Sequence, residues 1–164
     1  MDLLIGCGRS RVKQLGINGR ETWKDLVTLD LEPIADVVHD LNTLPLPFKD
    51  QQFAEIHAYD VLEHTGRQGD WRFFFDQWAE FYRILEPDGF FFGIVPYYTS
   101  LWAWGDPSHT RIITCEQLQF LSQRFYDKVD GCNMSDFRHY WKHDFELVQA
   151  DVIDGRQTFV LQKR

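Results

Sequence analysis

Short apolar runs separated by turn residues characterise the first part of the chain. Four of them have the length of β-strands, at residues 3–5, 26–29, 35–39 and 53–58. The second run ends in Asp30, the third ends in Asp40, and the fourth leads into the polar group Asp60, Glu63 and His64. Runs of this kind are typical of strands buried in a parallel sheet. The pattern therefore predicts strands whose carboxyl ends are followed by polar side chains.

One amphipathic helix is predicted after these strands. From Asp70 onward, apolar residues recur at intervals of three and four, and Pro87 with Gly89 ends the pattern. Residues 89–95 form a further apolar run. The helix is therefore predicted to connect two buried parallel strands, as in a βαβ unit.

The remaining elements are predicted from local motifs. Thr114 with Gln117 resembles a capping box, which indicates a second helix that reaches about Arg124. The segments 145–152 and 157–162 flank the turn Asp154-Gly155 and predict an antiparallel hairpin.

Two segments do not fit an ideal sheet protein. Residues 9–24 have poor helical periodicity, and residues 97–111 form a long aromatic loop of a length that usually serves a site. With the predicted elements, we expect an α/β fold in a minimal version. It consists of a doubly wound, mostly parallel sheet with a C-terminal antiparallel hairpin strand, in a single domain over residues 1–164.

Composition narrows the classes of function. The chain has 164 residues, of which 44% are hydrophobic, so it can form one substantial core. Its formal net charge of −8 opposes binding to nucleic acid or to an anionic membrane. No apolar stretch approaches the ~18 residues that a membrane span needs. We expect a cytoplasmic protein that binds a small molecule.

The cysteines give no sign of a disulfide framework. Cys7, Cys115 and Cys132 are odd in number and lack the spacing of a metal motif. We expect reduced thiols and no metal site.

The glycine turn after the first strand is a candidate ligand site, because ligands of an open α/β sheet bind beyond the strands' carboxyl ends. Gly6 and Gly8 let the backbone approach a ligand closely, and Asp30 follows about 20 residues later, where a ribose-binding acid is found. Asp30 is alternatively a helix cap. Arg11 stands where a dinucleotide-binding turn needs a small residue. A nicotinamide-dependent oxidoreductase is therefore disfavoured.

The chain resembles the class I S-adenosylmethionine-dependent methyltransferases over nearly its whole length, and it is similar to small bacterial and phage-type members. The resemblance rests on segments in that family's order and spacing: residues 4–8, 29–30, 36–42, 44–48, 56–64 and 83–89. It implies S-adenosylmethionine as the cofactor and methyl transfer as the activity.

The resemblance also implies roles for residues at the strand ends. The glycines of the first turn flank the methionine part of the cofactor, and Asp30 holds the ribose. Asp40 and Leu41 contact the adenine, and Tyr59 borders the sulfonium. The complete expected cofactor-binding set is Gly6, Cys7, Gly8, Asp30, Leu31, Asp40, Leu41, Tyr59 and Asp60.

Two features depart from the family's pattern. The first strand starts at Met1 without a preceding helix, and the helix expected after the glycine turn is eroded. We therefore expect a cofactor that is more exposed than usual, or one covered by a second chain in a homo-oligomer.

The implied chemistry needs few catalytic groups. Because a sulfonium methyl group is already activated, the protein mainly has to align an acceptor with it. A hydroxyl acceptor also needs a base, and His64 and His109 are the candidates since both lie in loops beyond strand ends. Each histidine has an alternative, purely structural role. Trp102 and Trp104 could stack on a sugar or simply pack within their loop.

We expect methyl transfer from S-adenosylmethionine to a small-molecule or saccharide-type acceptor, with oxygen favoured over nitrogen as the accepting atom. The alternative is a non-catalytic Rossmann-like domain that binds the cofactor and acts as an interaction module.

Overall fold

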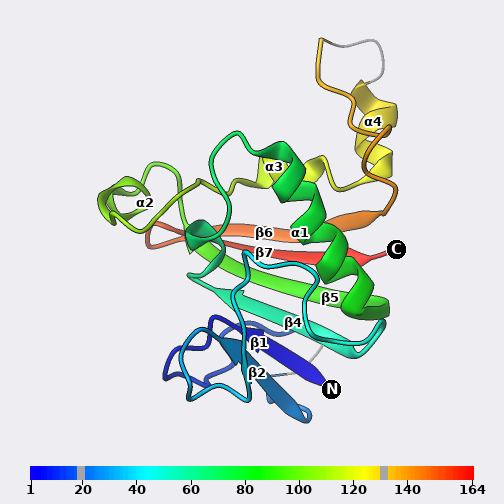
Figure 1. Cartoon of the computed structure of the whole chain (residues 1–164). Coiled ribbons are helices and arrows are strands. Elements are labelled where there is room, and N and C mark those ends of the chain that lie inside the picture. Colours follow the sequence, from blue (N-terminus) through cyan, green and yellow to red (C-terminus); the bar gives the residue numbers. More distant parts are fainter. Residues whose placement is uncertain (18–20, 130–132) are drawn as a thin grey trace.

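Seven strands form one sheet in the parts of the chain that the computed structural model describes, residues 1–17, 21–129 and 133–164 (Figure 1). The strands are β1 (Asp2–Ile5), β2 (Leu26–Asp30), β3 (Val37–Val38), β4 (Phe53–Tyr59), β5 (Leu85–Pro96), β6 (Phe145–Ile153) and β7 (Arg156–Lys163). Their spatial order is β3-β2-β1-β4-β5-β7-β6. In this order, neighbouring strands from β3 through β2, β1 and β4 to β5 pair in parallel. Strand β7 pairs antiparallel with both β5 and β6. The predicted mostly parallel sheet with a C-terminal hairpin is confirmed.

The helical segments lie mainly between β4 and β6 in the chain. They are η1 (Leu62–His64), α1 (Trp71–Ile84), α2 (Leu101–Gly105), α3 (Cys115–Gln119) and α4 (Gln123–Val129). The predicted amphipathic helix is α1, and the Asp70 carboxylate begins it by accepting a hydrogen bond from the backbone N–H of Phe73 at 3.1 Å. Its buried residues are Phe75, Gln77, Trp78, Phe81 and Ile84.

The predicted third strand over residues 35–39 is wrong in length, because β3 contains only two residues. The Asp36 carboxylate accepts hydrogen bonds from the backbone N–H and the hydroxyl of Thr28, at 2.9 and 2.7 Å. Before β3 begins, the Asp36 side chain therefore accepts the hydrogen bond that a neighbouring strand would otherwise accept from the Thr28 backbone.

The predicted helix over residues 114–124 is also corrected. The capping box of Thr114 and Gln117 is present, but the helix it begins ends at Gln119. The Asp144 carboxylate then accepts a hydrogen bond from the backbone N–H of Gln123 at 2.8 Å, at the start of α4. The predicted loop over residues 97–111 contains the short helix α2.

The two faces of the sheet are covered differently, since alternate residues of each strand point to opposite sides. On one face, side chains such as Ile56 and Phe91 form the large core with Trp78 of α1, which Figure 1 shows crossing the sheet. The second face carries a smaller cluster of Leu4, Cys7, Tyr59 and Ile94, on which Leu15, Trp23, Leu26 and Ala35 pack. Irregular chain rather than a helix therefore covers this face next to the glycine turn.

A buried ion pair attaches this irregular segment to the sheet. Lys13 Nζ lies 2.5 Å from Glu55 Oε2 and 3.6 Å from Asp2 Oδ2, and all three side chains are at most 5% exposed. Lys13 also donates to the backbone carbonyl of Thr22 at 3.3 Å. The Lys13 ammonium group thus connects two parts of the segment, at Lys13 and at Thr22, to β1 and β4.

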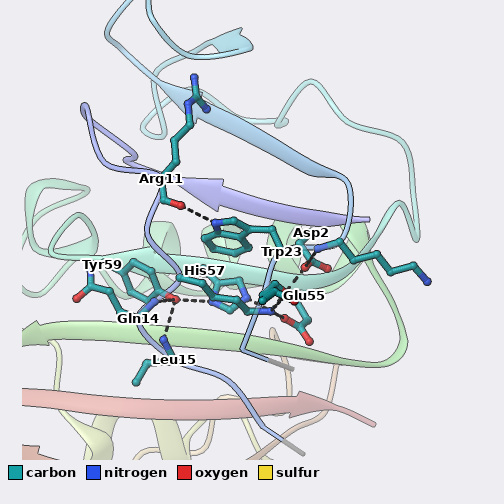
Figure 2. Close-up of polar contacts among 11 residues, drawn as sticks. Asp2, Arg11, Gln14, Leu15, Trp23, Glu55, His57 and Tyr59 are labelled. Atoms are coloured by element: carbon teal, nitrogen blue, oxygen red, sulfur yellow. Dashed lines mark hydrogen bonds and ion pairs between the residues drawn. The ribbon is translucent and has the colours of Figure 1, made fainter. Parts of the chain in front are cut away.

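Two further residues of β4 continue this network, as Figure 2 shows. Tyr59 Oη accepts hydrogen bonds from the backbone N–H groups of Gln14 and Leu15, both at 3.2 Å. His57 Nδ1 lies 2.6 Å from Tyr59 Oη, and its Nε2 lies 3.0 Å from Glu55 Oε2. Burial lowers the pKa of His57. A neutral imidazole that donates from Nε2 and accepts at Nδ1 satisfies every group in this chain of contacts.

Aromatic rings enclose His57 on the second face. The ring of Phe92 stacks on it at 4.5 Å, and the ring of Trp23 meets it edge-on at 4.8 Å. Trp23 Nε1 donates to the backbone carbonyl of Arg11 at 2.6 Å (Figure 2). These contacts hold the chain that leaves the glycine turn without a helix.

Two other expectations concern the thiols and a membrane span. Cys7 and Cys115 are free thiols, and Cys132 lies outside the described residues. Within the ranges that the structure describes, no helix combines the length and the apolar character needed to cross a membrane.

Replacing Lys13 by methionine should destabilise the protein, because Glu55 would then be a buried carboxylate without its cation. We expect the free energy of unfolding to fall by about 3 kcal/mol, measured by urea denaturation. Lys24→Met is the matched control, since Lys24 is exposed and its loss should change stability by less than about 0.5 kcal/mol. Equal effects of the two substitutions would contradict the assigned role of Lys13.

Acid should remove the contribution of Glu55 to stability. Burial raises the pKa of Glu55, but hydrogen bonds from His57 and Lys13 outweigh this and lower it from 4.5 to about 2. A lowered folded-state pKa stabilises the protein above pH 4.5, by ~3 kcal/mol, and this is lost as the pH falls towards 2. The difference in unfolding free energy between wild type and Glu55→Gln should shrink over this range. A difference independent of pH would show that Glu55 is not the titrating group.

Candidate functional site

The carboxyl ends of β1, β2 and β4 lie side by side at one edge of the sheet. Ile5 is in register with Leu29 of β2 and with Ala58 of β4. The residues that follow these strands, at the glycine turn, at Asp30 and at Asp60, therefore come together as the sequence predicts.

The two glycines of the turn differ in what surrounds them. Both have positive φ, 63° at Gly6 and 48° at Gly8, which favours glycine. A Cβ atom on Gly6 would lie 2.3 Å from Cγ2 of Val61, so packing alone requires a glycine there. A Cβ atom on Gly8 would meet nothing within 4 Å. The backbone at Gly8 therefore faces open space.

Asp30 ties the end of β2 to the glycine turn. Its Oδ2 accepts a hydrogen bond from the Gly8 backbone N–H at 2.8 Å, and its Oδ1 accepts from the Glu32 N–H at 3.0 Å. Among the described residues each carboxylate oxygen accepts one of these hydrogen bonds, and its second acceptor site suits a hydroxyl group. Residues 31–36 form turns and bends rather than a helix, so the alternative of Asp30 as a helix cap is wrong.

The other predicted cofactor-binding side chains differ in burial and in their contacts within the fold. Leu41 is 6% exposed within the large core, whereas Leu31 is 66% exposed. Cys7 belongs to the second cluster, and burial raises the pKa of its thiol. Asp40 Oδ1 accepts a hydrogen bond from the Asn42 N–H at 2.8 Å. The phenol of Tyr59 is part of the second-face network, although its backbone lies at the strand end.

Arg11 connects the glycine turn to the chain between β2 and β3. Its guanidinium donates to Thr28 Oγ1 at 2.8 Å and to the Ile34 carbonyl at 3.0 Å, and it lies 3.7 Å from Asp36 Oδ2. The large side chain that disfavours a dinucleotide-binding turn thus has a structural role here.

A cavity of about 370 Å³ lies beyond the carboxyl ends of β4 and β5. Its walls come from η1, the segment around α2 and the β6–β7 turn, and they include Asp60, His64, Trp102, His109 and Arg156. Asp60 and Arg156, both in its walls, form an ion pair. The cavity is next to the predicted cofactor site, because Asp60 belongs to both.

The two predicted catalytic histidines meet in this cavity. The ring centroids of His64 and His109 are 4.6 Å apart, in an edge-to-face arrangement. His64 Nδ1 lies 3.1 Å from Ser108 Oγ, and His109 Nε2 lies 3.8 Å from Asp106 Oδ2. His109 Nδ1 is buried and has no hydrogen-bond partner among the residues that the structure describes.

Glu63 is a site residue that the sequence prediction missed. It lies directly before His64 in η1, and its side chain is 2% exposed. Burial raises the pKa of Glu63 to about 7. The sequence signal was its place between the predicted site residues Asp60 and His64, but nothing in the sequence shows that it is buried.

Hydrogen bonds of the backbone hold Glu63 next to His109. The N–H groups of Thr110 and Arg111 donate to the Glu63 carbonyl at 2.8 and 3.3 Å. The side chain of Arg111 donates to the Leu62 carbonyl at 3.1 Å. These hydrogen bonds fix the segment after α2 against η1. We call the part of the cavity wall formed by Glu63, His64 and His109 the floor of the cavity.

Comparisons with known proteins identify the fold. No family model and no curated protein sequence matches this chain. A solved S-adenosylmethionine-dependent methyltransferase from Archaeoglobus fulgidus matches 99% of the chain and 85% of its own length, at 16% identity and a TM-score of 0.58. One from Mesorhizobium loti matches 99% and 90%, at 12% identity and a TM-score of 0.55.

A third solved structure is larger. The methyltransferase CalH, in complex with S-adenosylhomocysteine, matches 99% of the chain but 51% of its own length, at 15% identity and a TM-score of 0.55. Together with the strand order and the terminal hairpin, these matches show that the chain has the fold of the class I S-adenosylmethionine-dependent methyltransferases.

Proposed function

We propose that this protein transfers a methyl group from S-adenosylmethionine to an oxygen atom of a small-molecule or saccharide-type acceptor. One arrangement carries the proposal: an open glycine turn beside Asp30 lies at the same sheet edge as a cavity that contains two imidazoles. The fold supports it, since the solved proteins that share it are named methyltransferases and one of them holds S-adenosylhomocysteine.

The residues at the turn fit a nucleoside-bearing cofactor. The open space at Gly8 accommodates the amino-acid part, and the free acceptor positions of Asp30 suit ribose hydroxyl groups. When bound, S-adenosylmethionine supplies a methyl group on a sulfonium that is already activated towards attack. The remaining task of the protein is to orient the acceptor and to exclude water.

The cavity fits a small polar acceptor. Its volume of about 370 Å³ lies in the range of small-molecule sites. Asp60, Asp106 and Arg156 offer hydrogen bonds to hydroxyl groups. Trp102 is 71% exposed at the wall of the cavity, where its ring suits stacking on a sugar.

The chemistry requires a way out for one proton. The acceptor oxygen donates an electron pair to the methyl carbon, the carbon–sulfur bond breaks with its electrons on sulfur, and S-adenosylhomocysteine leaves. The hydroxyl proton must depart in the same process. His109 Nδ1 is buried in the cavity wall and has no described hydrogen-bond partner, so this histidine is suited to assist that departure.

Cofactor binding should depend on the open space at Gly8. We expect wild-type protein to bind S-adenosylhomocysteine with micromolar affinity in calorimetric titration, and Gly8→Ala to bind at least about tenfold more weakly. Gly69→Ala is the matched control, because Gly69 also has positive φ and open space but lies far along the chain from the turn. Both substitutions strain the backbone by about 1 kcal/mol, so only Gly8→Ala should lose affinity.

Asp30→Ala should weaken binding as well, since it removes the ribose acceptor. Absence of binding by the wild-type protein at millimolar ligand would overturn the proposed function, and so would full affinity in Gly8→Ala.

Turnover distinguishes an enzyme from an interaction module. With pools of hydroxylated small molecules and saccharides, we expect formation of S-adenosylhomocysteine, detected by mass spectrometry. His109→Ala should lower kcat by about a hundredfold and leave cofactor affinity unchanged, whereas exposed His139→Ala should change neither. Cofactor binding without product in any pool would favour the non-catalytic module instead.

A further inference from the structure

Glu63 is a buried carboxyl group without a hydrogen-bond partner in the part of the chain that the structure describes. Its side chain is 2% exposed, and neither Oε1 nor Oε2 accepts a hydrogen bond from a described residue. A carboxylate removed from water normally has donors or a cation around it, because its desolvation is costly. The position of Glu63 on the cavity wall therefore points to a partner that comes from outside the chain.

The cations near Glu63 are already engaged. Arg111 is buried and donates to three neutral acceptors: Leu62 O, Thr65 Oγ1 and Gln77 Oε1. Arg156, which also lines the cavity, is paired with Asp60. Neither guanidinium forms an ion pair with Glu63 in the described structure, so both carboxyl oxygens remain without a direct contact to a described cation.

Two imidazoles offer further lone pairs next to this carboxylate. His109 Nδ1 is buried without a described partner, and the contact of His64 Nδ1 with Ser108 leaves its Nε2 available. One ligand atom from each of Glu63, His64 and His109 lies within 4.8 Å of the other two. Ligand atoms around a tetrahedral ion lie roughly 3.4 Å apart, so small side-chain rotations would close the group on an ion.

We propose that Glu63, His64 and His109 bind one divalent first-row transition-metal ion at the floor of the acceptor cavity. Two imidazole nitrogens and one carboxylate suit Zn²⁺, Co²⁺, Mn²⁺ or Fe²⁺, whereas Mg²⁺ and Ca²⁺ prefer oxygen ligands alone. Asp106, 3.8 Å from His109 Nε2, is placed to orient that ring as an outer carboxylate. No metal site is expected from the spacing of the cysteines, and these three ligands come from two segments that are distant in the sequence.

The ion would also define the acceptor, a step that rests on the proposed function. Three protein ligands leave coordination positions open towards the cavity, and these accept an oxygen donor. A hydroxyl group bound to such an ion loses its proton to solvent more easily. His109 then assists the departure of the proton by holding this ion, as His64 does, and the expected acceptor presents a hydroxyl group that can coordinate a metal.

Metal binding can be measured without cofactor or acceptor. Protein purified without a histidine tag and treated with chelator is titrated with Co²⁺ by visible absorption and with Zn²⁺ by calorimetry. We expect one ion per chain, and at least about tenfold weaker binding in Glu63→Gln and in His109→Ala. His139→Ala is the control, because His139 is exposed and distant from the cluster in the chain. It should bind as the wild type does.

The variants also separate loss of the site from loss of the fold. Glu63→Gln removes a buried charge at constant volume, so its thermal unfolding temperature should not fall below that of the wild type. Absence of Co²⁺ and Zn²⁺ binding by the wild type, or undiminished binding by both ligand variants, would overturn the metal site. Titration of the metal-free protein with S-adenosylhomocysteine tests the proposed function separately, since that binding needs no ion at Glu63.

Discussion

The buried ion pair between Lys13 and Glu55 determines how the chain leaves the glycine turn. A helix at this point would satisfy its own backbone groups and cover the second face of the sheet. The irregular segment depends instead on β4, which supplies the Glu55 carboxylate for Lys13 and the Tyr59 hydroxyl for two backbone N–H groups. The same strand leads at its carboxyl end into Asp60 and η1. One strand therefore contacts the segment after the glycine turn and also leads into the cavity wall.

The periodicity of the sequence predicts those parts of the fold that depend on local pattern. The buried strands, the helix α1 and the terminal hairpin have apolar spacings or turn residues that need no distant partner. The segment after the glycine turn cannot be predicted in this way, because Lys13 pairs with a residue 42 positions away. The break before α4 is unpredictable for the same reason, since the Asp144 carboxylate accepts from the Gln123 N–H over 21 positions. Contacts at such separations leave no periodic signal.

For the candidate site, the sequence predicts the positions that depend on strand order but not the directions of individual side chains. Sheet topology brings the strand ends together, so His64 and the glycine turn belong to one edge whatever the details of the loops. Side-chain direction was not predictable. Tyr59 shares the second face with His57, two residues before it, and its phenol therefore lies in the network rather than at the edge. Likewise the burial of Glu63 depends on how the segment around His109 folds back onto η1.

Two buried glutamates of neighbouring segments differ in how their carboxyl groups are compensated by polar contacts. Glu55 and Glu63 are 1% and 2% exposed, but only Glu55 has a cation and an imidazole N–H within contact distance in the described structure. The first arrangement is the one expected where a buried carboxylate serves to hold the fold together. At Glu63 the fold instead places two imidazoles so that one nitrogen of each lies within 4.8 Å of a carboxyl oxygen and of the other nitrogen. Because an ion that binds only the folded chain adds to its stability, occupancy by a cation would supply the compensation that Glu55 finds within the chain.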